Sequence, residues 1–202
     1  MKKIIGIVMS GFLLAAMIAT PEPVFATDGP TAVISAGNGV TFAVQKDGSL
    51  WGYGNPKAGL GIDSADTIQT PVKIMDQVKS AVTNDGTSFA IKKDDTLWAW
   101  GDNAGKFGNG ASDDSITPVK VMDDVKMVSP GGGYSLILRS NGDLYATGAN
   151  SFGQLGDGTL TDKSTPTFIT GNVAIVSAGG SHSMIVKTDG TLWATGRNMD
   201  YE

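Results

Sequence analysis

Cysteine is absent from this 202-residue chain, histidine occurs once, and 15 basic residues stand against 20 acidic ones. Without cysteine there is no disulfide, no thiolate metal site and no cysteine nucleophile, so packing alone must hold the fold together. No basic cluster is available to neutralise phosphates, which supplies most of the affinity for nucleic acid. We therefore expect no nucleic-acid partner.

Long hydrophobic runs are also scarce. One run extends from Ile4 to Thr20 behind Lys2 and Lys3, and it is shorter than the roughly 20 residues that span a membrane. With the small residues that end at Ala26, it predicts a signal peptide over residues 1–26 and a secreted, extracellular protein, free or associated with the cell wall. Cleavage would leave 13 basic and 19 acidic residues and would move the net charge from −5 to −6. We expect no membrane contact after cleavage.

Glycine, in contrast, is abundant, with 28 residues against 8 prolines, and it recurs within an internal repeat. The strings LWGYGN, LWAWGDN, LYATGAN and LWATGRN begin at Leu50, Leu97, Leu144 and Leu192, which are 47, 47 and 48 residues apart. A Thr-Pro pair keeps the same step. A period of this length is typical of the four-stranded blade of a propeller, and a helical repeat would contain few glycines.

Each repeat also predicts short strands separated by tight turns. The runs at 41–45, 88–92, 135–139 and 183–187 each have three consecutive apolar residues at their centre, which indicates strands covered on both faces. Small sheets stacked around an axis provide that environment. Two-residue type I′ turns are expected at Asp47-Gly48, Asn141-Gly142 and Asp189-Gly190, with Asp94-Asp95 tolerated in the second repeat.

The predicted fold class is therefore all-β, a β-propeller built from blades of about 47 residues. Residues 27–202 form the propeller segment, with units at about 31–77, 78–124, 125–172 and an incomplete 173–202. These make about 3.7 repeats, too few for a ring. Three explanations stay open: missing C-terminal repeats of a longer chain, a homodimer of two arcs that closes the ring, or an open arc that is stable alone.

The strings SAGGSHSMIVKTDGTLWATGRN at 177–198 and GANSFGQLGDGT at 148–159 resemble the repeat of the regulator of chromosome condensation family, and the resemblance covers residues 31–198. The resemblance implies a propeller, usually of seven blades. Together with the predicted signal peptide, it implies an exported bacterial-type member of which this chain is a part. Asn84 departs from the pattern, as does GKFGNG at 105–110. The founding member acts on a nuclear GTPase and binds chromatin, but export, acidity and the missing basic tail argue against that activity here.

Candidates for chemistry are few. His182 lies where other repeats have Val40, Thr87 and Tyr134, so we expect a structural role. GKFGNG and the glycines at 131–133 open no helix, which argues against a phosphate loop. Gly156 to Thr159, with Asp162, lacks the ligand pattern of a calcium loop. The pairs Asp94-Asp95, Asp113-Asp114 and Asp123-Asp124 are typical of solvated turns. No catalytic, cofactor-binding or metal-binding residue is expected, no cofactor, and no enzyme.

Function is instead expected on a loop face. The long loops at about 55–70, 103–117 and 150–165 should gather at one end of the propeller, with scattered hydrophobic residues such as Phe152. Six aromatic residues share one register and are expected in the core: Trp51, Tyr53, Trp98, Trp100, Tyr145 and Trp193. We predict an extracellular protein-interaction scaffold with a protein partner. Alternatives are an inhibitor of an exported enzyme such as a β-lactamase, as in one exported relative, then glycan or cell-wall binding, and lastly an enzyme.

Overall fold

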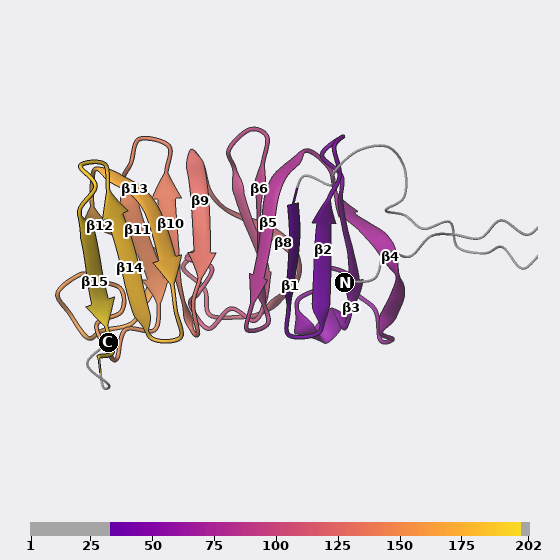
Figure 1. Cartoon of the computed structure of the whole chain (residues 1–202). Helices are drawn as coiled ribbons and strands as arrows, with labels where there is room; N and C mark the ends of the chain where they lie inside the picture. Colours follow the sequence, from indigo (N-terminus) through magenta and orange to yellow (C-terminus); the bar gives the residue numbers. More distant parts are fainter. Residues whose placement is uncertain (1–32, 199–202) are drawn as a thin grey trace, which may run out of the picture.

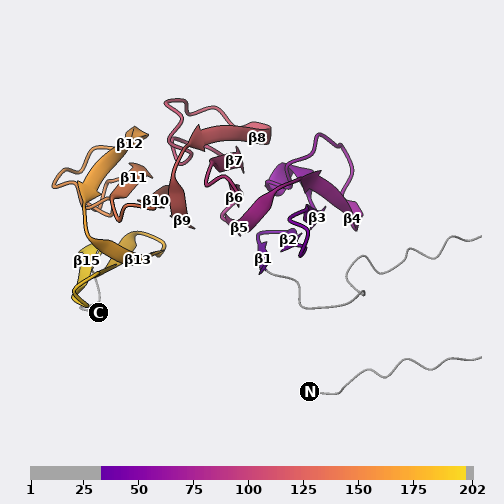
Figure 2. The same cartoon turned by 90° about the horizontal axis from the view of Figure 1, so that it is seen from above.

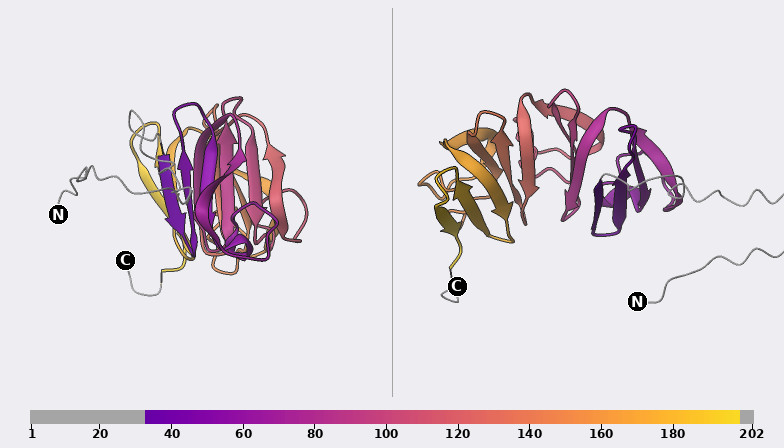
Figure 3. Two further views of the ribbon diagram at one scale, coloured as in Figure 1. Left: turned by 90° about the vertical axis from the view of Figure 1, so that its right-hand side faces the viewer. Right: turned by 45° about the horizontal axis from the view of Figure 1, so that its top comes forward.

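The computed structural model describes residues 33–198, which form four small antiparallel sheets standing side by side (Figure 1). Seen from above, the sheets follow one another along a curve and leave the ring open (Figure 2). A view tilted toward the top shows the same curved row of sheets, and a view from the side of blade 1 shows the sheets behind one another (Figure 3). The predicted signal peptide lies outside the described residues.

Consecutive strands build each sheet, in the order in which they occur in the chain. Blade 1 contains β1 (Val33–Gly37), β2 (Val40–Val44), β3 (Leu50–Gly54) and β4 (Ile68–Met75), with a 3-10 turn η1 at Pro56–Ala58. Blade 2 contains β5 (Val78–Asn84), β6 (Thr87–Lys92), β7 (Leu97–Gly101) and β8 (Ser115–Met122). Blade 3 contains β9 (Val125–Pro130), β10 (Tyr134–Arg139), β11 (Leu144–Gly148) and β12 (Lys163–Thr170). Blade 4 contains β13 (Val173–Ala178), β14 (His182–Lys187) and β15 (Leu192–Gly196).

The hydrophobic core lies between the blades. Strands β6 and β10 are buried at five consecutive positions, because a neighbouring blade covers each of their faces. The three buried clusters each combine residues of two successive blades, so every blade in the described arc is packed against the next. The all-β propeller architecture predicted from the repeat is therefore confirmed, and over residues 33–198 its ring is not closed.

The predicted type I′ turns are wrong in position. Asp47 does not have a positive φ; only Gly48 does, at 93°, and the amide of Gly48 donates to the carbonyl of Gln45. This is a type I turn closed by a left-handed glycine, favoured because the Asp47 carboxylate accepts from the amide and hydroxyl of Ser49. Paired positive φ angles occur instead between the first two strands of blades 1 and 2, at Asn38-Gly39 (40° and 88°) and Asp85-Gly86 (47° and 75°).

The expectation for the repeated aromatic residues is also partly wrong. Trp100 is fully buried, but Trp51, Trp98 and Tyr145 are only half-buried, and Tyr53 and Trp193 are exposed. Tyr53 belongs to the first described blade, which no earlier blade covers, and Trp193 lies on β15, which has no outer strand beside it in the described chain. The repeat therefore places these aromatic residues at the same position in each blade, while their burial depends on the adjacent blade and strand.

Candidate functional site

The three long loops lie along one side of the curved row of sheets, the lower side in Figure 1. They cover residues 55–67, 102–114 and 149–162, between the third and fourth strands of blades 1, 2 and 3. Their first amides donate to the short turns between the first two strands of the same blade: Asn55 to Gly39, Asp102 to Gly86 and Ala149 to Gly133, over 2.9–3.0 Å. Loops and short turns therefore form one face, here called the long-loop face.

Each long loop is anchored on the blade that follows it. Leu60, Phe107 and Leu155, one from each loop, are fully buried in the three clusters between the blades. A polar side chain from the next blade reaches a loop carbonyl at each junction: Trp100 to Gly59, Thr147 to Gly105 and Thr195 to Gly153, each over 2.8 Å. Because of these contacts the loops are held by two blades at once.

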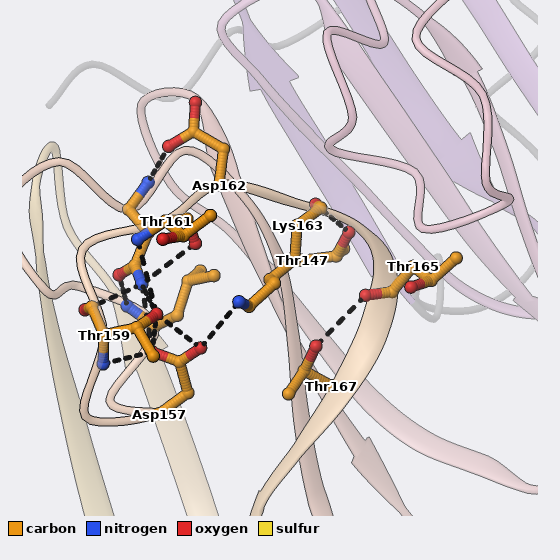
Figure 4. Close-up of polar contacts among 10 residues, drawn as sticks. Thr147, Asp157, Thr159, Thr161, Asp162, Lys163, Thr165 and Thr167 are labelled. Atoms are coloured by element: carbon orange, nitrogen blue, oxygen red, sulfur yellow. Dashed lines mark hydrogen bonds and ion pairs between the residues drawn. The ribbon is translucent and has the colours of Figure 1, made fainter.

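Asn150 organises the third loop from within. Its Oδ1 accepts from the Leu155 amide at 3.0 Å, and its Nδ2 donates to the Asp157 carboxylate and to the Thr159 carbonyl, both at 3.0 Å. Its own amide donates to Asp162 over 2.7 Å. Figure 4 shows these polar contacts around Asp157, Thr159 and Asp162. Asn103 has the same set of contacts in the second loop, at Phe107, Ala111, Asp113 and Asp114.

The carboxylates that faintly suggested calcium therefore face protein donors. Desolvation raises the pKa of Asp157, but hydrogen bonds from the amide and hydroxyl of Thr159, from Asn150 and from Lys163 outweigh it and hold that pKa below its ordinary value. Lys163 Nζ lies 3.4 Å from the carboxylate. Asp157 and Asp162 thus brace the loop through hydrogen bonds from protein donors.

The tip of the third loop carries two exposed hydrophobic side chains on the long-loop face. Phe152 and Leu160 are 48% and 69% exposed, and the Arg197 guanidinium lies over the Phe152 ring, 5.6 Å from its centroid. Leu160 packs across Gly153, with its Cδ2 3.6 Å from the point where a Cβ would lie. The three side chains, Phe152, Leu160 and Arg197, are called the loop-3 patch, and they come from two neighbouring blades.

Of these three residues, only Phe152 was predicted from the sequence; Leu160 and Arg197 were not. Phe152 lies where the third loop is one residue longer than the first two, so it has no counterpart at the repeat step, unlike the buried Leu155. Leu160 stands alone in a polar stretch. Phe152 and Leu160 could have been found as hydrophobic residues that do not recur at the repeat step. Arg197 carries no such signal, because only the fold brings it to the other two.

The other candidates lie apart from this patch. The exposed His182 ring packs over Gly179, and the His182 carbonyl accepts a hydrogen bond from the Tyr134 hydroxyl. Of the carboxylate pairs, Asp95 bonds Lys79, Asp114 bonds the Asn103 amide, and Asp123 and Asp124 pair with Lys120 and Arg139. Within residues 33–198 no group of three or more His, Asp or Glu side chains is placed to hold a metal.

A pocket of about 200 Å³ lies between blades 2 and 3. Phe89, Ile91, Met127 and Val128 line it, with Ser80 and Lys126 as its polar groups. It is smaller than the sites that usually enclose a small ligand, and it lacks convergent polar groups. Among the described residues no helix is long and apolar enough to cross a membrane.

Family models described as the regulator of chromosome condensation (RCC1) repeat match residues 141–186, and residues 125–154 with 173–201. The chain carries RCC1 repeats over residues 125–201. The matched RCC1 repeats cover blade 3, with its long loop at 149–162, and blade 4. No curated protein sequence matches the chain.

Solved propellers share the fold of these RCC1 repeats. Yeast RCC1 (Prp20) bound to Kap60 is 22% identical, with a TM-score of 0.72, and the match covers 84% of this chain and 45% of that one. Prp20p from Saccharomyces cerevisiae, described with its binding to Gsp1p and histones, is similar over 85% and 47%, at 22% identity and a TM-score of 0.72. Human WBSCR16 is 17% identical over 86% and 49%, with a TM-score of 0.73. The chain thus spans about half the length of these structures.

Proposed function

We propose that this chain is an exported protein-interaction module that holds its partner on the long-loop face, at the loop-3 patch. The pairing of an exposed apolar tip with a rigidly braced loop carries the proposal. Phe152 and Leu160 are exposed on a loop that Asn150 ties together internally. Aromatic and arginine side chains are the residue types that dominate protein interfaces, and a pre-organised loop loses less conformational entropy on binding.

The bracing also fixes the position of Phe152 itself. Its amide donates to the Oε1 of Gln154 at 2.9 Å, and Gln154 is almost fully buried. The carbonyl of Gln154 in turn accepts from the Ser183 hydroxyl of blade 4 at 2.7 Å. The Phe152 backbone is therefore tied to two blades, so its ring is presented by the scaffold and not by a free loop.

Arg197 defines the chemistry of the partner. Its backbone amide donates to the Ser181 carbonyl, its guanidinium lies over the Phe152 ring, and the residue is exposed. An apolar side chain that packs on Phe152 and Leu160 beside a carboxylate that meets Arg197 fits this surface. The exported location rests on the leader-like sequence of residues 1–26. Inhibition of an exported enzyme is one form that such binding can take.

Photo-cross-linking tests the proposal. A photoreactive residue replaces Phe152, Leu160 or, as a control, Ile116, which is 56% exposed on the outer strand of blade 2. Each variant is incubated with the extracellular proteins of the producing cells, and a product made from the two patch positions alone is identified by mass spectrometry. Cross-linking from all three positions, or from none, contradicts the proposal.

Titration of the purified partner then measures what the patch contributes. Phe152→Ala and Arg197→Ala should each weaken binding roughly 10-fold or more, as expected for central anchors, and Ile116→Ala should change it less than about twofold. Equal dissociation constants for all variants would place the partner on another surface.

A further inference from the structure

The junction between blades 2 and 3 lacks a hydrogen bond that the other two junctions of the described arc contain. At each of those, a serine hydroxyl accepts from a backbone amide in the first strand of the next blade: Ser35 from Thr83 at 3.1 Å and Ser129 from Ala178 at 2.9 Å. Val82 and Pro130 stand at these two positions between blades 2 and 3. Valine has no hydroxyl group and proline has no amide hydrogen, so the bond cannot form there.

A second bond is missing at the same junction. Ser88 and Ser183 each donate to a carbonyl in the long loop of the preceding blade, over 2.7 Å. Ser135 is the equivalent residue of blade 3, and its buried hydroxyl has no partner among residues 33–198. Blades 2 and 3 thus lack two of the hydrogen bonds that align their neighbours. Strands β5 and β9 remain joined at their long-loop end, where Asn84 Nδ2 donates to the Pro130 carbonyl at 3.0 Å.

The pocket of about 200 Å³ lies at this junction, between β5 and β9, which are the innermost strands of their blades on the concave side of the arc (Figure 2). Its apolar wall includes Val82, Phe89, Ile91 and Val128, of which the last three are buried. An apolar cavity of about 150 Å³ is large enough to enclose benzene. The pocket therefore has room for one small aromatic or branched group.

Lys126 lies at the solvent side of this pocket. Its side chain is exposed, and no residue of the described part of the chain pairs with its ammonium group. Its counterpart in blade 2, Lys79, binds Asp95 at 2.8 Å. Blade 3 has Gly142 at the position of Asp95, so the carboxylate that would neutralise Lys126 is lacking. An unpaired cation thus stands beside an apolar cavity.

We infer that this pocket binds a small monocarboxylate whose body is a single aromatic ring or a short branched chain, about the size of benzoate. The apolar body packs against Phe89 and Val128, and the carboxylate meets Lys126, with the Ser80 hydroxyl offered from the opposite wall. Two polar groups are too few to orient a strongly polar metabolite, but they suffice for one charged end.

The two parts of the ligand contribute differently. Burial of the apolar body supplies most of the affinity, whereas an exposed ion pair adds little and chiefly selects an acid over a neutral molecule of the same shape. For a ligand as small as benzoate, a dissociation constant of about 1 mM is expected. The inference does not depend on the loop-3 patch, because the pocket lies between two blades inside the arc and not on a long loop.

An NMR titration of the full chain with benzoate, followed at the methyl groups of valine, isoleucine and methionine, tests the site. Up to about 20 mM, the methyl signals of Val82, Ile91 and Val128 should shift and saturate. Benzyl alcohol has a similar size and no charge, and it should bind at the same methyl groups about fivefold more weakly. Equal affinities would overturn the assignment to a carboxylate, and no saturable shift at these signals would overturn the site.

Substitutions at Lys126 separate the charge from the cavity. Lys126→Met should weaken benzoate about fivefold and leave benzyl alcohol unchanged. Lys79→Met is the matched control, at the same repeat position in blade 2, and should leave both probes unchanged. Gly142→Asp restores the carboxylate that blade 2 has at Asp95, so it should weaken benzoate alone, without any change in the pocket wall. Equal effects of Lys126→Met and Lys79→Met would contradict the proposed contact.

Filling the pocket tests the cavity. Val82→Phe places a larger side chain in the wall and should weaken both probes about tenfold or more. Val82 is half-buried beside free volume, so the variant should still melt cooperatively. Ile116→Phe, at an exposed residue outside the pocket, is the control and should bind as the wild type does. Undiminished binding of both probes to a folded Val82→Phe variant would place them elsewhere and refute the inference.

Discussion

The indole nitrogen of Trp100 donates a 2.8 Å hydrogen bond to the carbonyl oxygen of Gly59, which belongs to the long loop of the preceding blade. The same oxygen accepts from the Ser88 hydroxyl at 2.7 Å, and the neighbouring Leu60 is fully buried between the blades. The loop of one blade is thus part of the packing surface of the next. Stability and the presentation of the long-loop face therefore depend on the same contacts.

Trp100→Phe should lower the free energy of unfolding by roughly 2 kcal/mol, mainly through the cavity left at a fully buried site beside Phe42. The Gly59 carbonyl keeps its bond from Ser88, so little is added for an unpaired acceptor. Urea denaturation measures the change. Trp98→Phe, at a half-buried indole that bonds Thr96, is the matched control and should lose less than about 1 kcal/mol. Equal losses would contradict this account of the junction.

Three serines at one position of the repeat should differ in their importance. Ser88 and Ser183 donate to loop carbonyls of the preceding blade over 2.7 Å, whereas the buried Ser135 hydroxyl has no partner among the described residues. Ser88→Ala and Ser183→Ala should each cost roughly 1–2 kcal/mol, and Ser135→Ala about zero. Thermal or urea unfolding of the three variants decides this. A comparable loss for Ser135→Ala would mean that its hydroxyl is bonded.

The repeat allowed the strands and blades to be predicted because blade packing imposes the same apolar positions every 47 or 48 residues. Turn geometry did not follow from the sequence in the same way. Asp47-Gly48 and Asn38-Gly39 both suit a type I′ turn. They differ in the number of residues that connect the two paired strands. Five residues separate the paired Val44 and Leu50, and two separate Gly37 from Val40.

The candidate site was harder to predict than the fold. Phe152 and Leu155 lie three residues apart in one loop, yet the first is 48% exposed and the second is fully buried. Hydrophobicity alone does not distinguish them, although Leu155 recurs as Leu60 and Phe107 in the other repeats. Arg197 reaches the patch from the end of β15 through the packing of blade 4 on blade 3, which no local pattern reveals.

Asn150→Ala should destabilise the chain by roughly 2–3 kcal/mol, since it leaves the buried Leu155 amide and the Thr159 carbonyl without partners. Asn55→Ala removes one bond to the exposed Lys57 amide in the first loop and should cost less than about 1 kcal/mol. Urea midpoints compare the two. If the proposed function holds, Asn150→Ala should also weaken partner binding, because Phe152 loses its fixed position.

Asp157 should make stability depend on pH. Its folded-state pKa lies below its ordinary value, so the stability that its carboxylate contributes is present above the unfolded-state pKa of about 3.9 and is lost as the pH falls through the lower folded-state value. Asp157→Asn should therefore be roughly 1 kcal/mol less stable than the wild type at pH 7, and the gap should close below about pH 4. Urea midpoints of both proteins across this range test it. A gap that widens in acid would reverse the assigned sign.

Asp95→Gly should stabilise the chain. Asp95 has a φ of 61°, and the equivalent residues Gly48, Gly142 and Gly190 have φ between 85° and 93°. A left-handed conformation strains a residue with a Cβ by about 1 kcal/mol, which exceeds the worth of the exposed 2.8 Å ion pair between Asp95 and Lys79.

The net gain for Asp95→Gly should be about 0.5 kcal/mol, because glycine also has more freedom in the unfolded chain. Lys79→Ala removes the ion pair alone and should cost less than that. Gly142→Ala is the reverse experiment: its Cβ would lie 3.5 Å from the Val173 carbonyl, an ordinary contact, so a loss of about 1 kcal/mol would report the backbone strain by itself. If Asp95→Gly destabilises while Gly142→Ala is neutral, the ion pair and not the turn conformation controls this hairpin.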